Sequence, residues 1–239
     1  MTTTLPITGL PMSGAPERVL VVGDPARAEA VAERLDCADL IASNREYRSY
    51  RGGWLGTDVM VVSHGVGSAG AGVCFTEIIR SGATHLVRAG TCGGLQSSVS
   101  DGDLVIALGA VRDDGYTHGL VAPTYPAVAD PGITTALLQA APRGHQGVVL
   151  TSDVFYPSEV LGSNLPMWQR ARCIAVEMEC AALFVTSSLA AVRAGAILAV
   201  DGNPLADNDE SMEGYNPDRT IVRDAVSTMI DAALTALVA

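Results

Sequence analysis

The sequence contains no lysine: all 15 basic residues among its 239 are arginines. Without lysine the protein forms no Schiff base with a carbonyl substrate or with pyridoxal phosphate. The P-loop and kinase classes, which place a lysine on a phosphate, are excluded as well. A small phosphate ligand is not excluded, because a few arginines can be focused in one cleft.

Positive charge is also scarce overall. The sequence has 15 arginines and 26 acidic residues, which gives a formal net charge of −11 and a pI near 4.6. Because a nucleic-acid partner needs a basic footprint for its phosphate backbone, we expect none here. Hydrophobic residues at 48% and charged residues at 17% are typical of a globular chain.

Signals for export, membrane insertion and metal binding are missing too. Residues 1–16 have no basic region followed by an apolar run, and the most apolar stretch, 176–200, is interrupted by Glu177, Glu179 and Arg193. The five cysteines show no CxxC spacing, and the four histidines are scattered singly. We therefore expect a cytoplasmic protein with reduced thiols, no membrane span and no metal site.

Short β-branched runs alternate with longer helical patterns along the chain. They predict strands over residues 19–22, 59–62, 86–88, 104–107, 148–150 and 197–200, and helices over residues 26–35, 69–81, 133–141, 178–193 and 218–237. This alternation predicts an α/β fold of three layers, with a mostly parallel central sheet flanked by helices. We expect a single domain over residues 1–239, with an N-terminal arm of residues 1–16 and a mobile surface loop over 202–218.

Ligands of such sheets bind at the carboxyl ends of the strands, so the residues after each predicted strand are the candidates. After the first strand, Gly23 permits close approach of a ligand, and Pro25 starts a helix whose N-terminus attracts anions. Arg27 in the first turn of that helix is unfavourable unless an anion lies nearby. The alternative is an ordinary turn between a strand and a helix.

A GxGxxG pattern, the fingerprint of dinucleotide-binding proteins, spans Gly65 to Gly70 after the second strand. That fingerprint also requires an acidic residue about 20 positions later, and the stretch His85–Arg88 has none. An NADP site could use Arg88 instead. We favour glycines that allow a tight turn and close packing of helix and strand.

The third strand ends in Arg88 and is followed by the glycine-rich turn that contains Thr91. A guanidinium and a hydroxyl at this place suit an oxyanion, although Arg88 could instead be a partly buried arginine in a salt bridge. Cys92 in the same turn is interpreted as a packing thiol, since no base stands beside it. Arg45, considered alone, is a surface arginine.

Carboxylates mark two later strand ends. Glu177 and Glu179 are two positions apart and so cannot share a helix face. A carboxylate in so apolar a segment needs a hydrogen-bonding partner, and the two O–H donors of a vicinal diol match its two oxygens. The alternative is a charge that complements the dipole of the following helix. Asp201 follows the last strand directly and is a candidate general acid if burial raises its pKa; otherwise it simply starts a turn.

Together these segments resemble the nucleoside phosphorylase-I family, which includes hexameric purine nucleoside phosphorylases and uridine phosphorylases. The resemblance covers residues 19 to about 238 and is carried by VVGDPAR (21–27), SNREY (43–47), SHGVGSAG (63–70), VRAGTCGGLQ (87–96), PAVAD (126–130), TSDVFYP (151–157) and VEMECAALF (176–184). Three segments, SNREY, SHGVGSAG and VDGNP (200–204), look most like the purine enzymes of apicomplexan parasites. The resemblance implies a phosphorylase/hydrolase-like fold.

The resemblance also implies an activity and residue roles. The activity is reversible phosphorolysis of a nucleoside, with inorganic phosphate as co-substrate and no other cofactor. The phosphate would be held by Gly23, Arg27, Arg88 and Thr91, with Arg45 reaching across a dimer interface in a hexamer built as a trimer of dimers. The ribose would be held by Met178 and Glu179, with Glu177 beside them, while Phe155 would stack on the base and Asp201 would protonate a purine N7.

The identity of the base rests on a departure from the family pattern. Uridine phosphorylases carry a Gln-x-Arg pair that reads the uracil edge, and residues 156–161 contain neither residue. This favours inosine or guanosine over uridine, and uridine phosphorolysis is the alternative.

A second departure is Ile7, which stands where the family often has a histidine for the sugar 5′-hydroxyl. A catalytically silent nucleoside-binding protein of the same fold is an alternative from a different class.

Overall fold

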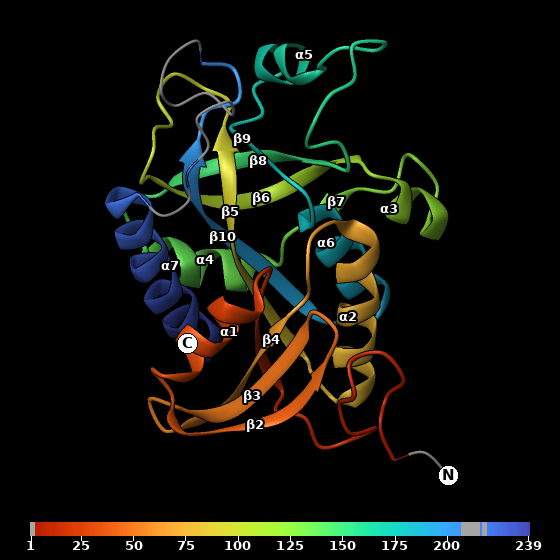
Figure 1. The fold of residues 1–239 in the computed structure, drawn as a ribbon, viewed down its shortest axis with the longest axis vertical. Coiled ribbons are helices and arrows are strands. Elements are labelled where there is room, and N and C mark those ends of the chain that lie inside the picture. The colour runs from red at the N-terminus through yellow and green to blue at the C-terminus, as the bar shows by residue number, and fades with distance from the viewer. Residues whose placement is uncertain (1–2, 207–215, 217–218) are drawn as a thin grey trace.

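The computed structural model describes residues 3–206, 216 and 219–239 (Figure 1). In chain order the elements are β1 (Arg18–Val22), α1 (Pro25–Ala32), β2 (Asp36–Asn44), β3 (Tyr47–Trp54), β4 (Thr57–Ser63), α2 (Ser68–Ser81), β5 (His85–Gly94), β6 (Leu104–Asp113), α3 (Gly115–Leu120), β7 (Ala127–Val128), α4 (Pro131–Ala140), β8 (His145–Ser152), α5 (Leu165–Arg170), β9 (Ala175–Glu177), α6 (Cys180–Leu189), β10 (Arg193–Gly202) and α7 (Thr220–Val238).

All the described strands join one sheet in the order β10-β6-β8-β9-β5-β1-β4-β3-β2, with β7 paired to β6. Because β10 also pairs with β5, the strands β5, β10, β6, β8 and β9 close into a barrel-like ring. Five of the ten strand pairings are parallel (β1–β4, β1–β5, β5–β10, β6–β8 and β8–β9). The α/β class is confirmed. The sheet is mixed and has a closed, barrel-like part, which differs from the predicted three layers around a mostly parallel central sheet.

The six predicted strands fall within β1, β4, β5, β6, β8 and β10, and the five predicted helices correspond to α1, α2, α4, α6 and α7. The hairpin β2–β3 was not predicted because β2 is largely exposed and lacks a buried apolar stripe. The helix predicted over 178–193 is shorter, because a turn with Ala191 at φ +56° separates α6 from β10. Most of the predicted loop 202–218, namely residues 207–215 and 217–218, lies outside the described residues.

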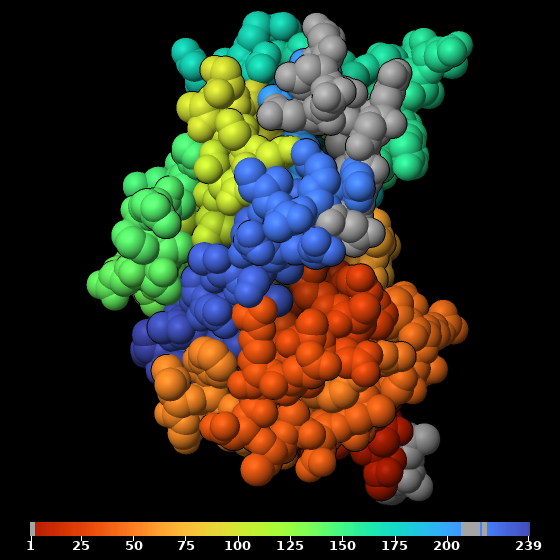
Figure 2. Space-filling model, turned by 60° about the vertical axis from the view of Figure 1, so that its left-hand side comes forward, coloured from red at the N-terminus to blue at the C-terminus, as the bar shows by residue number. Residues whose placement is uncertain are grey.

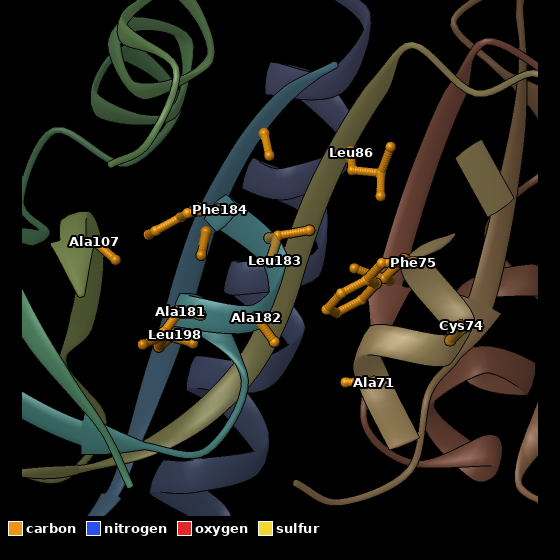
Figure 3. Close-up of a cluster of buried hydrophobic side chains, with 14 of the residues drawn as sticks. Ala71, Cys74, Phe75, Leu86, Ala107, Ala181, Ala182, Leu183, Phe184 and Leu198 are labelled. Carbon is orange, nitrogen blue, oxygen red and sulfur yellow. The ribbon is translucent and has the colours of Figure 1, made fainter. Parts of the chain in front are cut away.

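The core lies on both faces of the sheet, because successive strand side chains point in opposite directions. On β1, Val19 and Val21 pack toward the side of α2 and α6, whereas Leu20 and Val22 pack toward the side of α1, α4 and α7. Phe75, from α2, and Leu183 and Phe184, from α6, lie in the first of these two clusters (Figure 3).

Helix α7 belongs to the second cluster and also contacts elements from the N-terminal part of the chain. Its buried side chains pack against β10, β5 and β1, and it lies alongside α4 (Figure 2). Arg34, just after α1, donates to Asp231 of α7 at 2.6 Å. These contacts enclose the sheet on the side opposite to α2 and α6.

The N-terminal arm is anchored by a buried carboxylate in the middle of α2. Glu77 is 4% exposed, and its Oε2 accepts the N–H and the hydroxyl of Thr8 at 2.7 and 2.8 Å. The N–H of Ile7 donates to Oε1 of Glu77 at 3.2 Å. Leu5 and Leu10 are buried in the core. The carbonyl of Ile7 accepts from the side chain of Asn44 at the end of β2, so Glu77 indirectly fixes the tip of the β2–β3 hairpin.

Replacing the anchoring carboxylate tests this arrangement. Glu77→Gln turns an acceptor into an NH₂ group that faces the N–H donors of the arm, and we expect the free energy of unfolding to fall by about 1–3 kcal/mol. Glu33→Gln, at an exposed position after α1, is the matched control and should stay within about 0.5 kcal/mol of wild type. Urea denaturation measures both; equal stabilities for the two variants would contradict the anchoring role.

Candidate active site

A cavity of about 630 Å³ opens at the carboxyl ends of the strands. Its lining includes every site residue predicted from the sequence except Arg45, namely Gly23, Arg27, Arg88, Thr91, Phe155, Glu177, Met178, Glu179 and Asp201. These residues come from segments far apart in the sequence, and the folded sheet places them at one edge, as expected for an α/β protein.

The turn after β1 forms one wall of the cavity. Asp24 caps α1 by accepting the N–H of Ala26 at 2.8 Å, and Pro25 occupies the first helical turn. Arg27 in that turn is partly exposed and lines the cavity. The carbonyl of Gly23 accepts the N–H of Gly65 at 2.9 Å, so the turns after β1 and β4 are held together.

The glycine run after β4 binds the protein's own chain. Gly65 and Gly67 have φ values of +75° and +93°, which only glycine adopts readily. The N–H of Gly67 donates to Oε1 of Glu179 at 2.6 Å, and the hydroxyl of Ser68 donates to the carbonyl of Met178 at 2.8 Å. This geometry agrees with the interpretation of the GxGxxG pattern as a tight turn.

Arg88 lies at the centre of the site and is 3% exposed. Its Nη2 donates to Oε2 of Glu179 and, at 3.3 Å, to Oε2 of Glu177. Burial by itself would lower the pKa of Arg88, but attraction to Glu179 and Glu177 outweighs burial and raises it. The Nε–H of Arg88 is buried and has no hydrogen-bond partner in the described part of the chain. The alternative interpretation of Arg88 as a buried, salt-bridged arginine is therefore correct, and Arg88 lines the cavity as well.

Gly90 makes room for this guanidinium. A Cβ atom at position 90 would lie 2.1 Å from Nη1 of Arg88, far inside van der Waals contact. The absence of a side chain at Gly90 is thus a steric requirement of the buried arginine.

The two glutamates occupy different structural positions. Glu177 ends β9, whereas Glu179 is the N-cap residue of α6, in agreement with the prediction that they do not share a helix face. Burial raises the pKa of Glu179, and the charge of Glu177 raises it further, while Arg88 opposes both effects. Glu179 is consequently a buried carboxylate held between the Gly67 N–H and a guanidinium.

Asp201 reaches the cavity through an irregularity in the sheet. The pairing of β10 with β5 shifts register between Val200 and Gly202, which leaves Asp201 as the bulged residue. Bulges redirect side chains next to active sites. Asp201 is 6% exposed, and its carbonyl accepts from Arg219 at 2.8 Å.

The remaining wall of the cavity is largely apolar and includes Val66, Val154, Phe155, Leu165, Val176, Met178 and Pro204. Phe155 is 44% exposed at the rim and contacts Tyr156 edge to face, with ring centroids 4.8 Å apart. A cleft with apolar walls and a few convergent charged groups suits an aromatic, partly polar ligand.

Two buried groups near the cavity are held neutral. Burial raises the pKa of the Cys92 thiol well above its usual value, and Asp201 and Glu177 add to the effect, which supports a packing role for this cysteine. Burial lowers the pKa of His64, and the charges of Arg88 and Arg27 lower it further. Sequence reasoning did not identify His64 because a single histidine beside glycines carries no functional signal.

Arg45 is the one predicted site residue that does not line this cavity. It occupies the exposed turn between β2 and β3, where its φ is +54°. Its neighbour Glu46, which the sequence did not single out, does line the cavity and packs against Gly65.

Within residues 3–206, 216 and 219–239, no helix has the length and apolar character that crossing a bilayer requires. In the same ranges no three His, Cys, Asp or Glu side chains are grouped in a way that would hold a metal ion.

Comparison with known proteins agrees with this geometry. A family model described as the phosphorylase superfamily matches residues 17–238. Purine nucleoside phosphorylase from Plasmodium vivax is 38% identical over 221 residues, covering 90% of this chain and 88% of the relative. Uridine phosphorylase from Haemophilus influenzae is 35% identical over 197 residues, covering 76% of this chain and 78% of the relative.

The crystal structure of purine nucleoside phosphorylase from Toxoplasma gondii in complex with immucillin-H superimposes with a TM-score of 0.93 at 30% identity. The superposition covers 99% of this chain and 96% of that one. Because the family model matches residues 17–238, nearly the whole sequence, the chain belongs to the phosphorylase superfamily.

Proposed function

We propose that this protein catalyses the reversible phosphorolysis of a purine ribonucleoside, such as inosine or guanosine, to the free base and ribose 1-phosphate. The observation that carries the proposal is Arg88, which lines the cavity and whose buried Nε–H has no acceptor among the described residues. A buried donor left unpaired costs about 1–3 kcal/mol, and a phosphate oxygen in the adjoining cavity would satisfy it. The purine nucleoside phosphorylases among the relatives support the same activity.

The phosphate is assigned to the side of the cavity formed by the turn after β1. Gly23 offers a main-chain N–H, Arg27 lies in the first turn of α1, and Arg88 and Thr91 come from β5. Guanidinium groups bind phosphate through paired N–H donors, and a helix N-terminus adds a favourable dipole. Inorganic phosphate is then a co-substrate, and the proposed reaction needs no other cofactor.

The ribose is assigned to Met178 and Glu179. The carboxylate of Glu179 accepts the 2′- and 3′-hydroxyls, which present two O–H donors in the geometry that a carboxylate prefers. Met178 covers the ring with its apolar side chain. Arg88, assigned to phosphate, and Glu179, assigned to ribose, are hydrogen-bonded to each other, so the two proposed subsites adjoin.

In the reaction a phosphate oxygen forms a bond to C1′ while the bond from C1′ to N9 of the purine breaks. The electron pair of the broken bond passes to the base, and Asp201 donates a proton or a hydrogen bond to N7. The transition state carries positive charge on the sugar, which the phosphate stabilises, and negative charge on the base, which Asp201 stabilises. Phe155 at the rim packs against the leaving base.

A purine is favoured over uridine by the residues at the mouth of the cavity. Residues 156–161, which follow the rim residue Phe155, are all exposed, and none is the glutamine or arginine that would read the polar edge of uracil. The base instead meets apolar side chains such as Val154 and Val176, with Asp201 as the polar partner.

The positive charge needed to bind phosphate is also a reason to propose an oligomer. Among the described residues of one chain, only Arg27 and Arg88 bring positive charge to the cavity, and Arg88 is already paired with two carboxylates. A third cation is available on Arg45, which is exposed at the tip of the β2–β3 hairpin. We therefore assign Arg45 to the phosphate of a neighbouring subunit, in a homo-oligomer built as a hexamer from three dimers.

The thiols fit a cytoplasmic location. All five cysteines are free, and Cys74, Cys92, Cys173 and Cys180 are buried. Free thiols of this kind are typical of a reducing compartment.

The substrate assignment predicts the outcome of a panel of inosine, guanosine, adenosine, uridine and methylthioadenosine, each incubated with and without inorganic phosphate. Base release, measured by chromatography, should depend on phosphate and should be fastest with inosine or guanosine. Efficient cleavage of uridine with inosine left intact would reverse the assignment. Equal base release without phosphate would indicate hydrolysis, and binding without any release would indicate a silent nucleoside-binding protein.

Removing the acid tests the role of Asp201. Asp201→Asn keeps the shape but cannot donate a proton to N7, so kcat for inosine should fall by about a hundredfold or more. Nucleoside binding, followed by isothermal titration, should persist because Glu179 is intact. The control Asp58→Asn, on an exposed residue of β4, should retain full activity. Full turnover by the Asp201 variant would remove this residue from the mechanism.

Subunit mixing tests whether Arg45 acts across an interface. Arg45→Ala and Asp201→Asn are each expected to be nearly inactive alone. In a mixed dimer, one site combines an intact Asp201 with an Arg45 from the other chain, so random exchange should restore roughly a quarter of wild-type activity. If the mixture stays as inactive as its components after verified subunit exchange, Arg45 acts within its own chain.

A further inference from the structure

Thr151 lies at the end of β8, outside the lining of the cavity, and its side chain is completely buried. Its hydroxyl donates to Oε1 of Glu177 and accepts the N–H of Ala181, in the first turn of α6, at 2.9 Å. The hydroxyl therefore connects the end of β8, the end of β9 and the start of α6. A hydroxyl can both donate and accept, and Thr151 does both here.

Glu177 directs its carboxylate to the protein and not to the cavity. Oε2 accepts the main-chain N–H groups of Glu179 and Cys180 at 2.7 and 2.8 Å, and it also accepts from Arg88 at 3.3 Å. Together with the Thr151 hydroxyl on Oε1, four donors surround this carboxylate, three on Oε2 and one on Oε1. Its side chain is fully buried. The Glu177 carboxylate is therefore bound by the protein and is not exposed to a sugar hydroxyl in the cavity.

One oxygen of Glu177 thus holds groups from both halves of the site. Oε2 binds the guanidinium of Arg88, which is assigned to phosphate, and the main-chain N–H of Glu179, whose side chain is assigned to ribose. The same Arg88 Nη2 also donates to the Glu179 carboxylate. Any rotation of the Glu177 carboxylate would change the separation of the two substrates, and the Thr151 hydroxyl opposes that rotation.

We propose that Thr151 and Glu177 are positioning residues that set the distance between phosphate and ribose, an inference that rests on the proposed phosphorolysis. Neither residue touches a substrate. Each acts through Arg88 and Glu179 by a buried hydrogen-bond network, in which low polarity strengthens every member. Because a displacement of about 1 Å can cost about a hundredfold in rate, such a network is sufficient to control turnover.

A purely structural role makes a different prediction. If Glu177 and Thr151 only capped α6, their loss would lower stability and leave the Michaelis constants of the folded enzyme unchanged. If they position Arg88, the Michaelis constant for phosphate must rise even in enzyme that is fully folded.

The test compares Thr151→Val with Thr151→Ser. Valine has the shape of threonine without its hydroxyl, whereas serine keeps the hydroxyl. We expect Thr151→Val to raise the Michaelis constant for phosphate about tenfold with inosine as the second substrate, while Thr151→Ser stays within about twofold of wild type. The control is Thr134→Val, which removes a hydroxyl that donates to the carbonyl of Asp130 at the start of α4. It tests the general effect of losing a threonine hydroxyl and should leave the Michaelis constant for phosphate unchanged.

A second readout uses inorganic phosphate alone and does not need turnover. Phosphate should raise the Tm of wild type and of Thr151→Ser, and the rise should be smaller for Thr151→Val and for Glu177→Gln, which removes the charge facing Arg88. If Thr151→Val does not fold, Glu177→Gln carries both measurements. Wild-type Michaelis constants and phosphate shifts in folded Thr151→Val and Glu177→Gln would overturn the proposal.

The two proposals fail separately. If wild type releases no base from any nucleoside of the panel, the proposed function is wrong, and the phosphate-dependent Tm shift still tests whether Thr151 and Glu177 position Arg88. If wild type is active and the valine variant matches it, only the positioning role is wrong.

Discussion

The site depends on the burial of one guanidinium between two carboxylates. Transferring such groups from water costs several kcal/mol per ion, and the cost is offset only when each ion is paired and hydrogen-bonded. Arg88 and Glu179 meet this condition through each other, and Glu179 also accepts from Gly67. Two carboxylates around one guanidinium leave an excess of negative charge, so a phosphate dianion cannot be bound by Arg88 alone. This imbalance is the physical reason to assign Arg27 and the Arg45 of a neighbour to the same anion.

The closed ring of strands brings the proposed acid to this guanidinium. Because β10 pairs with β5 in parallel, Ala199 lies beside Thr91 and Val200 beside Cys92, next to the assigned phosphate-binding residues. The bulge at Asp201 then releases its side chain from the regular alternation of the strand. A simple open sheet would leave β10 at an edge. The barrel-like closure therefore explains how a residue 113 positions after Arg88 in sequence becomes its neighbour in the cavity.

The sequence predicts the strand ends well, because buried β-branched runs and the helices between them leave a clear periodic pattern. Local signals therefore identified Gly23, Arg27, Arg88 and Asp201 as candidates before their spatial relation was known. Sequence does not reveal register, so the β10 bulge and the ring closure were missed. It also does not show which oxygen a buried carboxylate presents. Glu177 was grouped with ribose-binding residues, whereas its four hydrogen-bond donors come from the protein. Thr151 begins the TSDVFYP segment, but the sequence does not show that its hydroxyl is bonded to a buried carboxylate, so it was given no role.

The glycines of β5 show how a sequence pattern can have a different physical cause from the expected one. The sequence predicts a glycine-rich turn after the third strand, yet Gly90, Gly93 and Gly94 belong to β5, and none of them has a positive φ. Added Cβ atoms would meet the Arg88 guanidinium at 2.1 Å, Pro204 at 2.8 Å and the carbonyl of Val99 at 2.6 Å. Glycine is needed at these positions because neighbouring atoms leave no space for a Cβ atom. Of these three glycines, Gly90 makes room for the Arg88 guanidinium, whereas Gly93 and Gly94 make room for Pro204 and Val99. The glycine that follows Arg88 by two positions is thus a steric condition for the arginine assigned to phosphate.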